Sequence, residues 1–320
     1  MFEPLRVGVL GCAEIARRRM LPAFAAADGV ELTGVAARDY ARAVETAAPY
    51  DCKAFESYEA LIESVDAVYI PLPAALHERW VERALDAGKH VLSEKPVTTN
   101  ASGTRRLLAL ARDRGRVLME NVLFVHHGQH IAARRLVRDG AIGTLTGFEA
   151  AFTVPRPKPG DIRHSAELGG GALLDVGIYP VRAAVHLLGG PLRVKEAAYT
   201  SVSTVEYGGT ATLETADGVT ARLTYGMDHE YRSAYTFTGS KGTLALEHVF
   251  TTPADRRPML RLDRSGGSER ISLEPEDQVA ATVRAFASAC RIGRTTTADC
   301  LAQADLLDEI KARSEQEARK

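Results

Sequence analysis

Residues 5–16 read LRVGVLGCAEIA, and this stretch sets the fold class. Residues 5–10 are a short apolar run typical of a buried strand, and a glycine follows at position 11. A glycine there lets the chain turn tightly into a helix, while small residues such as Ala13 and Ala16 permit close backbone and helix–strand approach. The resulting G-x-A-x-x-A is a variant of the dinucleotide-binding turn G-x-G-x-x-G/A, with Ala13 in place of glycine.

The rest of residues 1–122 alternates strand and helix in the same way. Short runs rich in Val, Ile and Leu alternate with stretches of helical spacing that end at glycine, such as HERWVERALDAG (77–88) and ASGTRRLLALARDRG (101–115). Repeated βαβ units predict a doubly wound parallel sheet of the α/β class. We therefore expect residues 1–122 to form a Rossmann dinucleotide-binding domain.

Residues 123–320 have a different pattern, which predicts an α+β domain with an open, mostly antiparallel sheet. Alternating polar and apolar residues predict two hairpins, at 210–226 and 234–248. The other expected elements are a strand at 144–154 and helices near 127–139, 172–188, 276–291 and 298–317.

Composition limits the function classes. Forty Lys plus Arg balance forty-one Asp plus Glu, so neither nucleic acid nor an anionic membrane is an implied partner. The start of the chain has no leader pattern, and no apolar run reaches the roughly 18 residues of a membrane span. Four cysteines lie scattered without disulfide or zinc spacing, at 12, 52, 290 and 300. We expect a cytoplasmic protein without a metal.

The end of the second predicted strand indicates which dinucleotide is bound. Ala37 stands where an acidic residue would hold the ribose 2′-hydroxyl, and the guanidinium of Arg38 follows, which can bind a 2′-phosphate. We therefore expect NADP(H) in preference to NAD(H), although Arg38 could also be a solvated side chain. Asp39 is interpreted as the N-cap of the next helix.

Residues 66–96 read DAVYIPLPAALHERWVERALDAGKHVLSEKP, and GGGALLDVGIY occupies 169–179. With the glycine turn, these motifs resemble the Gfo/Idh/MocA family of oxidoreductases over nearly the whole chain. The family pattern is carried by Pro73, His77 and Glu94-Lys95-Pro96. The resemblance implies a cis peptide bond between Lys95 and Pro96.

The same resemblance implies that Lys95 and Tyr179 are catalytic. Lys95 follows a predicted strand, at the carboxyl edge of the sheet where a nicotinamide is expected. Asp175 and Tyr179 are four apart on a predicted helix and share a face. A tyrosine beside a lysine is a reasonable general acid for carbonyl reduction. Without the resemblance, Tyr179 would be interpreted as a core aromatic residue and Glu94-Lys95 as a surface pair.

The resemblance also implies a set of cofactor-binding residues. Glu94 would orient Lys95 or the cofactor ribose, and His77 would contact the cofactor or cap its helix. Trp80 is interpreted as a core residue. The full cofactor set is Gly11, Ala13, Glu14, Ile15, Ala37, Arg38, Leu72, Pro73, His77, Glu94, Lys95 and Asn121.

Residues 119–130 and 159–184 resemble more narrowly the NADPH-dependent sugar 3-ketoreductases of deoxysugar biosynthesis. This implies reduction at C-3 of a TDP-linked 3,4-diketo-2,6-dideoxyhexose. Tyr179 would protonate the alkoxide, Asp175 would bind the sugar, and Arg163 and Asn121 would line the cleft. The resemblance also implies a homodimer or homotetramer.

Two other functions remain open from the sequence. One is an NADP-dependent dihydrodiol or simple-sugar dehydrogenase of the same fold, and the other is a non-catalytic dinucleotide-sensing regulator.

Four histidines match no metal-binding motif and are interpreted as loop and helix surface residues. They are His126, His127, His130 and His164.

Overall fold

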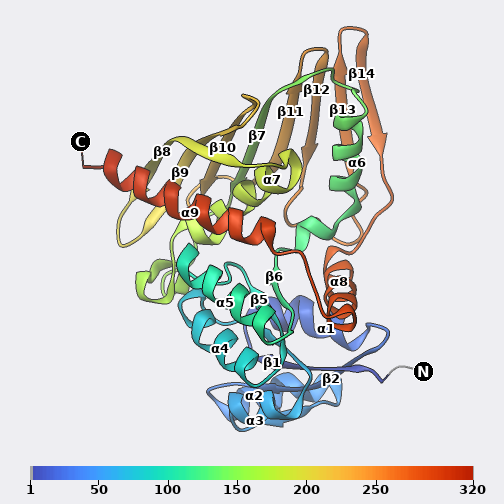
Figure 1. Ribbon diagram of the computed structural model, residues 1–320, viewed down its shortest axis with the longest axis vertical. Coiled ribbons are helices and arrows are strands. Elements are labelled where there is room, and N and C mark those ends of the chain that lie inside the picture. Colours follow the sequence, from blue (N-terminus) through green and yellow to red (C-terminus); the bar gives the residue numbers. More distant parts are fainter. Residues whose placement is uncertain (1–2, 320) are drawn as a thin grey trace. The chain divides into compact units, whose positions relative to one another are not determined.

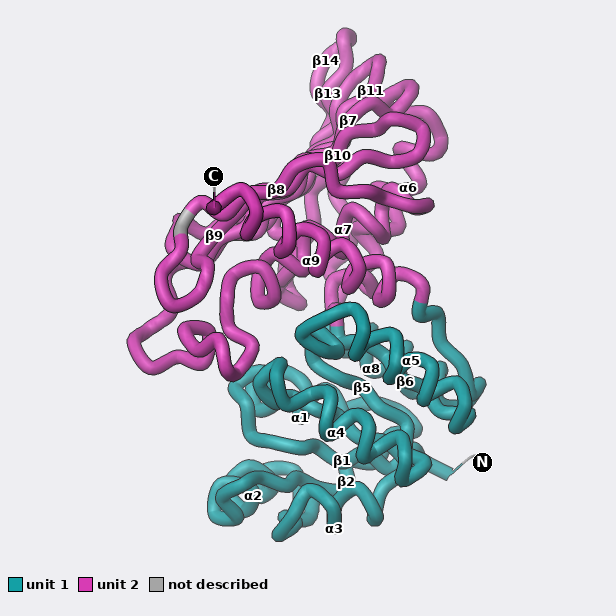
Figure 2. Tube along the Cα trace, turned by 60° about the vertical axis from the view of Figure 1, so that its left-hand side comes forward, with its two compact units in different colours: residues 1–121, 279–297 teal, residues 122–278, 298–320 magenta. Residues whose placement is uncertain are grey.

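The computed structural model describes residues 3–319, which form two compact units. The first unit combines Met1–Asn121 with Val279–Thr297, and the second combines Val122–Gln278 with Ala298–Lys320 (Figure 2). Each unit has its own sheet and core.

The first unit is built on a parallel sheet. Over residues 3–319 its six strands follow the order β3-β2-β1-β4-β5-β6, so the order reverses between β1 and β4. In open α/β sheets, ligands bind beyond the carboxyl ends of the strands at such a reversal. The strands are β1 (Leu5–Leu10), β2 (Val30–Ala36), β3 (Lys53–Phe55), β4 (Ala67–Ile70), β5 (His90–Glu94) and β6 (Leu118–Asn121).

Helices connect these strands, and local side chains fix where several of them begin. Asp39 accepts a hydrogen bond from the backbone N–H of Ala41 at 3.0 Å, which confirms it as the N-cap of α2. Trp80 is 8% exposed and packs edge-on against Tyr58, which confirms it as a core residue. The helices are α1 (Leu21–Ala25), α2 (Tyr40–Ala47), α3 (Tyr58–Ser64), α4 (Ala74–Asp86) and α5 (Ala101–Asp113).

The helix α8 (Gln278–Ile292) corrects the expected domain boundary. We assigned all of 123–320 to the second domain, but Val279–Thr297 groups with the first unit. The reason is an apolar stripe with helical spacing, buried at Val283 and Phe286 among others. The Arg291 guanidinium also donates a hydrogen bond to the carbonyl of Gly29, at 3.1 Å, in the turn before β2.

The second unit contains a mixed, mostly antiparallel sheet, as predicted. Its order is β14-β13-β12-β11-β7-β10-β9-β8, and both expected hairpins, β9–β10 and β11–β12, are present. Only the β7–β10 pairing is parallel within the described residues. The strands are β7 (Leu145–Thr153), β8 (Leu192–Val202), β9 (Glu206–Thr215), β10 (Thr220–Gly226), β11 (Arg232–Gly239), β12 (Gly242–Glu247), β13 (Met259–Arg264) and β14 (Gly267–Ser272).

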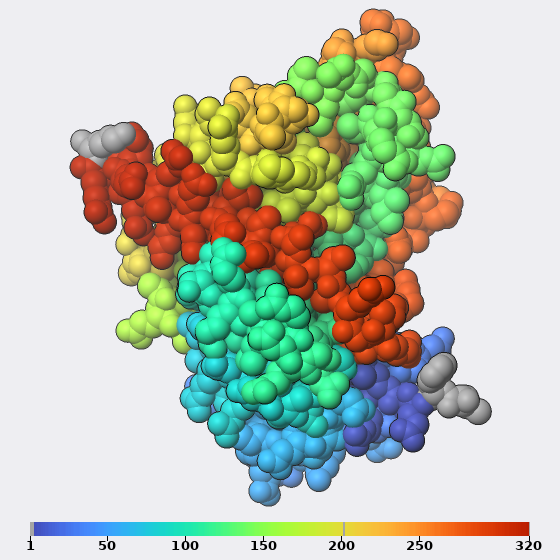
Figure 3. Space-filling view, viewed as in Figure 1, coloured from blue at the N-terminus to red at the C-terminus, as the bar shows by residue number. Residues whose placement is uncertain are grey.

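Three helices lie on the same side of this sheet: α6 (Gly128–Arg138), α7 (Ile178–Leu188) and α9 (Ala298–Glu317) (Figure 1). The core lies between them and the strands, and the outer side of α9 is seen in red in Figure 3.

The stretch Ala166–Leu188 has the length and the apolar composition of a membrane span, which we did not expect. Its most apolar part is 72% buried inside the protein, as in a core helix.

We predict that Gly34→Ala destabilises the first unit. Gly34 lies on β2, and an added Cβ would stand 2.4 Å from the carbonyl oxygen of Lys53 on β3, which is backbone and cannot rotate away. Overpacking of this kind costs about 1–3 kcal/mol. Thermal unfolding followed by circular dichroism measures the effect.

The matched control is Gly147→Ala on β7, where the nearest atoms to an added Cβ lie at 3.7 and 3.8 Å. This variant should unfold at or slightly above the wild-type temperature. Equal melting temperatures for the two variants would contradict the close approach at Gly34.

Candidate functional site

The glycine turn has the geometry that the sequence predicts. Gly11 has φ of 115°, a conformation that favours glycine, and its N–H donates to the carbonyl of Ala36 at 2.7 Å. An added Cβ would stand 3.0 Å from Cδ2 of Leu72. The turn therefore ties the ends of β1 and β2 together and leaves Ala13 at the start of the next helix.

Two guanidinium groups, one just after β2 and one on α2, lie near the same tyrosine. Burial raises the pKa of the Tyr58 hydroxyl, and the charges of Arg38 and Arg42 oppose that rise, so both lie close to it. Arg42 belongs to the first turn of α2, and its carbonyl lies 3.6 Å from Sγ of Cys12 in the glycine turn. Ala37 is half-buried beside exposed Arg38. We did not predict Arg42, whose only signal is its spacing of four from Arg38.

A half-buried carboxylate, that of Glu94, lies at the carboxyl edge of the same sheet and gathers several polar groups around it. Glu94, at the end of β5, pairs in register with Asn121, at the end of β6. Its Oε1 accepts hydrogen bonds from the Tyr69 hydroxyl at 2.6 Å and from the Asn121 amide at 2.5 Å. Its Oε2 accepts the backbone N–H of Lys95 at 3.3 Å. The structure thus brings together Glu94, Lys95 and Asn121, with Tyr69 as an unpredicted member.

His77 lies between two turns of the first unit. Its side chain is 1% exposed, and its Nδ1 and Nε2 lie 2.7 Å from the carbonyls of Pro96 and Leu72 respectively. Both ring nitrogens therefore face carbonyl oxygens of the first unit, and the expected contact of His77 with the cofactor stays a prediction. Burial lowers the pKa of His77. The ring links the Leu72–Pro73 turn to the Lys95–Pro96 peptide, which is cis as expected.

The predicted substrate-binding residues of the second unit form an ion pair. Nε of Arg163 donates to Oδ2 of Asp175 at 2.6 Å, and its Nη1 lies 3.1 Å from Oδ2 of Asp161. The neighbouring Asp175 and Asp161 raise the pKa of Arg163, which keeps the guanidinium charged. Arg163 thus orients the Asp175 carboxylate.

Tyr179 lies half-buried on an aromatic wall. Its ring centroid is 4.8 Å from that of Phe152, 5.7 Å from Phe250 and 6.2 Å from Phe124. We expected Asp175 and Tyr179 on one regular helix, but Asp175 belongs to a π-helical turn, Leu173–Gly177, and α7 begins after it. Lys95 belongs to the first unit and Tyr179 to the second.

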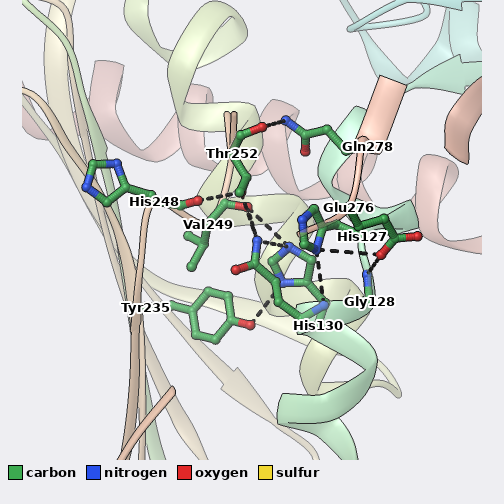
Figure 4. A network of polar contacts seen from close by, with 10 residues as sticks. His127, Gly128, His130, Tyr235, His248, Val249, Thr252, Glu276 and Gln278 are labelled. Atoms are coloured by element: carbon green, nitrogen blue, oxygen red, sulfur yellow. Dashed lines mark hydrogen bonds and ion pairs between the residues drawn. The ribbon is translucent and has the colours of Figure 1, made fainter. Parts of the chain in front are cut away.

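The histidines correct another expectation. His127 and His130 are not surface residues: they are 1% and 0% exposed (Figure 4). The Nδ1 of His130 lies 2.9 Å from the Tyr235 hydroxyl and its Nε2 lies 3.1 Å from the carbonyl of Val249, while His127 Nδ1 accepts the N–H of Gln129. Burial lowers the pKa of both rings. They dock α6 onto the sheet.

The other two histidines are less deeply placed. Burial lowers the pKa of His126 to about 4. The Nδ1 of His164 lies 2.6 Å from the Tyr207 hydroxyl and its Nε2 lies 3.0 Å from the carbonyl of Lys158, so it fixes the proline-rich loop. Within residues 3–319, no group of three or more His, Cys, Asp or Glu is placed to hold a metal ion.

The first unit fits a dinucleotide. The glycine turn precedes a helix and leaves room only for a small residue, as a bound pyrophosphate requires. Oδ1 of Asn121 is buried at the carboxyl edge of the sheet and has no hydrogen-bond partner within the described residues, so it can accept a ligand N–H or O–H. The predicted cofactor residues lie around these two features or, like Arg38, follow β2. They would hold NAD(P).

Comparison with known proteins agrees with this geometry. A sequence model of the Gfo/Idh/MocA oxidoreductase family with the NAD-binding Rossmann fold matches residues 5–122. A model of the Gfo/Idh/MocA C-terminal domain matches residues 130–245. Both parts of the chain therefore match parts of one family.

Individual relatives extend over nearly the whole chain. A Streptomyces violaceoruber dTDP-3,4-didehydro-2,6-dideoxy-alpha-D-glucose 3-reductase is 49% identical, covering 96% of this chain and 94% of its own length. The same enzyme of Actinomadura kijaniata is 47% identical, covering 97% and 95%. The structure of a 3-ketoreductase from Actinomadura kijaniata in complex with NADP and TDP-benzene superposes with a TM-score of 0.94, at 46% identity, covering 97% of this chain and 98% of that one. The chain therefore belongs to the Gfo/Idh/MocA family of NAD(P)-binding oxidoreductases, as its motifs predicted.

Proposed function

We propose that this protein reduces the C-3 keto group of a TDP-linked 3,4-diketo-2,6-dideoxyhexose with NADPH. The observation that carries the proposal is the 49% identity, over 96% of this chain, to a 3-reductase of that sugar. The cofactor-binding features of the first unit and the Arg163–Asp175 pair of the second support it. An oxidative dehydrogenase would use the same side chains, so the assay must distinguish the two by substrate.

The residues divide the chemistry between them. Bound NADPH supplies the hydride that reduces the keto carbon. The Tyr179 hydroxyl donates its proton to the oxygen at C-3, and the Lys95 ammonium donates a hydrogen bond to that oxygen, which stabilises the developing alkoxide. Asp175, oriented by Arg163, accepts hydrogen bonds from the sugar. The aromatic residues around Tyr179 fix its ring so that the hydroxyl needs no reorientation.

We predict that Tyr179→Phe lowers kcat by roughly 10²–10⁴-fold, because general acid catalysis contributes about that much. Phenylalanine keeps the contacts with Phe152 and Phe250, so the melting temperature should stay within a few degrees of wild type. The measurement is the loss of NADPH absorbance with the enzymatically prepared diketo sugar. Lys95→Met, assayed in parallel, should also lose activity, and full activity in either variant would remove that residue from the mechanism.

We further propose that NADP(H) is preferred over NAD(H). The guanidinium groups of Arg38 and Arg42, which both act on Tyr58, support this because they could bind a 2′-phosphate. A charge-assisted hydrogen bond contributes about 1.5–3 kcal/mol, so Arg38→Ala should raise the KM for NADPH roughly 10- to 100-fold and leave that for NADH nearly unchanged. Arg112→Ala, an exposed arginine on α5, is the control. An equal change in both KM values would contradict phosphate recognition by Arg38.

We also propose a homodimer or homotetramer that forms through the outer face of the eight-stranded sheet. Helices cover one face, while the other presents exposed, oppositely charged side chains such as Glu149 and Arg222, 3.7 Å apart. A second copy related by two-fold symmetry could pair such charges across an interface. Light scattering should give twice or four times the 34.5 kDa chain mass, whereas a monomer at micromolar concentration would contradict the proposal.

We propose the cytoplasm as the compartment, because the four cysteines are free thiols in the structure. Cell fractionation tests this, and recovery with the membrane or secreted fraction would contradict it.

A further inference from the structure

A fully buried tyrosine hydroxyl lies behind the Lys95 turn. Tyr69, on β4, is 0% exposed, and its hydroxyl contacts Oε1 of Glu94 at 2.6 Å. Phenylalanine would pack equally well in such a position, and burying a hydroxyl is unfavourable unless it makes a hydrogen bond. The hydroxyl is therefore explained by its acceptor, Glu94.

The Glu94 carboxylate accepts hydrogen bonds from three donors, two side chains and one backbone N–H. Tyr69 and the amide of Asn121 both donate to Oε1, which leaves Oε2 for the backbone N–H of Lys95. The Tyr69 ring packs against Phe24 at a centroid distance of 5.7 Å, so its hydroxyl has little freedom. A carboxylate held in this way cannot rotate without losing its hydrogen bonds to the buried side chains of Tyr69 and Asn121.

The residues after Lys95 are held as well. The carbonyl of Pro96 lies 2.7 Å from Nδ1 of His77, and the N–H of Val97 donates to Oε1 of Glu120 at 3.1 Å. His77 and Glu120 are 1% and 8% exposed. Hydrogen bonds therefore hold the backbone on both sides of Lys95. Tyr69 acts on the side where the half-buried Glu94 meets Lys95.

We propose that Tyr69 is a positioning residue that acts through Glu94 to hold the Lys95 backbone in the reactive arrangement. This rests on the proposed role of Lys95 in catalysis. Tyr69 is fully buried, so its effect reaches the reaction through the carboxylate. A small displacement of a catalytic group can lower turnover by about 10²-fold.

The test is a double-mutant cycle with Tyr69→Phe and Glu94→Gln, made in the full-length protein. Tyr69→Phe should lower kcat roughly ten- to 100-fold, with a smaller change in the KM for the sugar. In the Glu94→Gln background the same change should have little further effect, because the hydroxyl acts through the carboxylate. If the two substitutions lower kcat independently, so that their fold-changes multiply in the double variant, the proposal is overturned. Independent effects are what a purely structural role of Tyr69 predicts.

Tyr235→Phe is the matched control, because it removes an equally buried hydroxyl, bonded to His130, from the second unit. Its kcat should stay near wild type even if its stability falls as far as that of Tyr69→Phe. Equal losses of kcat in the two variants would show that Tyr69 acts through stability alone and would overturn the proposal.

Hydrogen–deuterium exchange of residues 90–98 with NADPH bound gives a readout that needs no sugar substrate. The amide of Lys95 should exchange faster in Tyr69→Phe than in wild type and stay protected in Tyr235→Phe. Unchanged exchange in Tyr69→Phe would overturn the proposal whatever the activity. If the Lys95 amide exchanges faster in Tyr69→Phe but the wild-type protein does not reduce the diketo sugar, the positioning role of Tyr69 is supported and the proposed substrate is contradicted instead.

Discussion

The parallel register of β1, β4, β5 and β6 is the constraint on which the first unit depends. Parallel strands end at the same edge, so the glycine turn after β1, the β4 tyrosine and the paired Glu94 and Asn121 are brought to one place by backbone hydrogen bonds alone. A one-residue slip would turn Glu94 to the other face and remove the acceptor from Tyr69. The chemistry at this edge is thus a consequence of strand pairing.

In the second unit, the charged and phenolic groups lie on an apolar support. The Arg163–Asp175 pair is anchored to a π-helical turn, while Tyr179 follows on α7 against an aromatic wall. Glu206 accepts the N–H of Leu173 at the start of this turn, and an added Cβ at Gly171 would collide with the same carboxylate. Close packing of the turn against β9 explains the glycine and fixes where Asp175 stands.

Local patterns predicted much of this from the sequence. The glycine turn, the Asp39 cap and both hairpins depend on neighbouring residues and were confirmed. What failed depends on contacts between distant residues. Nothing in the sequence around His130 indicates that its ring is buried, because Val249, whose carbonyl lies next to its Nε2, is 119 residues away. The membership of α8 in the first unit and the Tyr69–Glu94 contact were missed for the same reason.

Isotopic labelling shows whether the hydride from NADPH reaches C-3 of the sugar. The protein is incubated with NADPH deuterated at the transferable C-4 position of the nicotinamide and with the TDP-linked 3,4-diketo-2,6-dideoxyhexose, and the product is examined by NMR. If the hydride goes to C-3, the product carries one deuterium at C-3 and an intact keto group at C-4. Deuterium at C-4, or unreacted sugar beside bound NADPH, would contradict reduction at C-3.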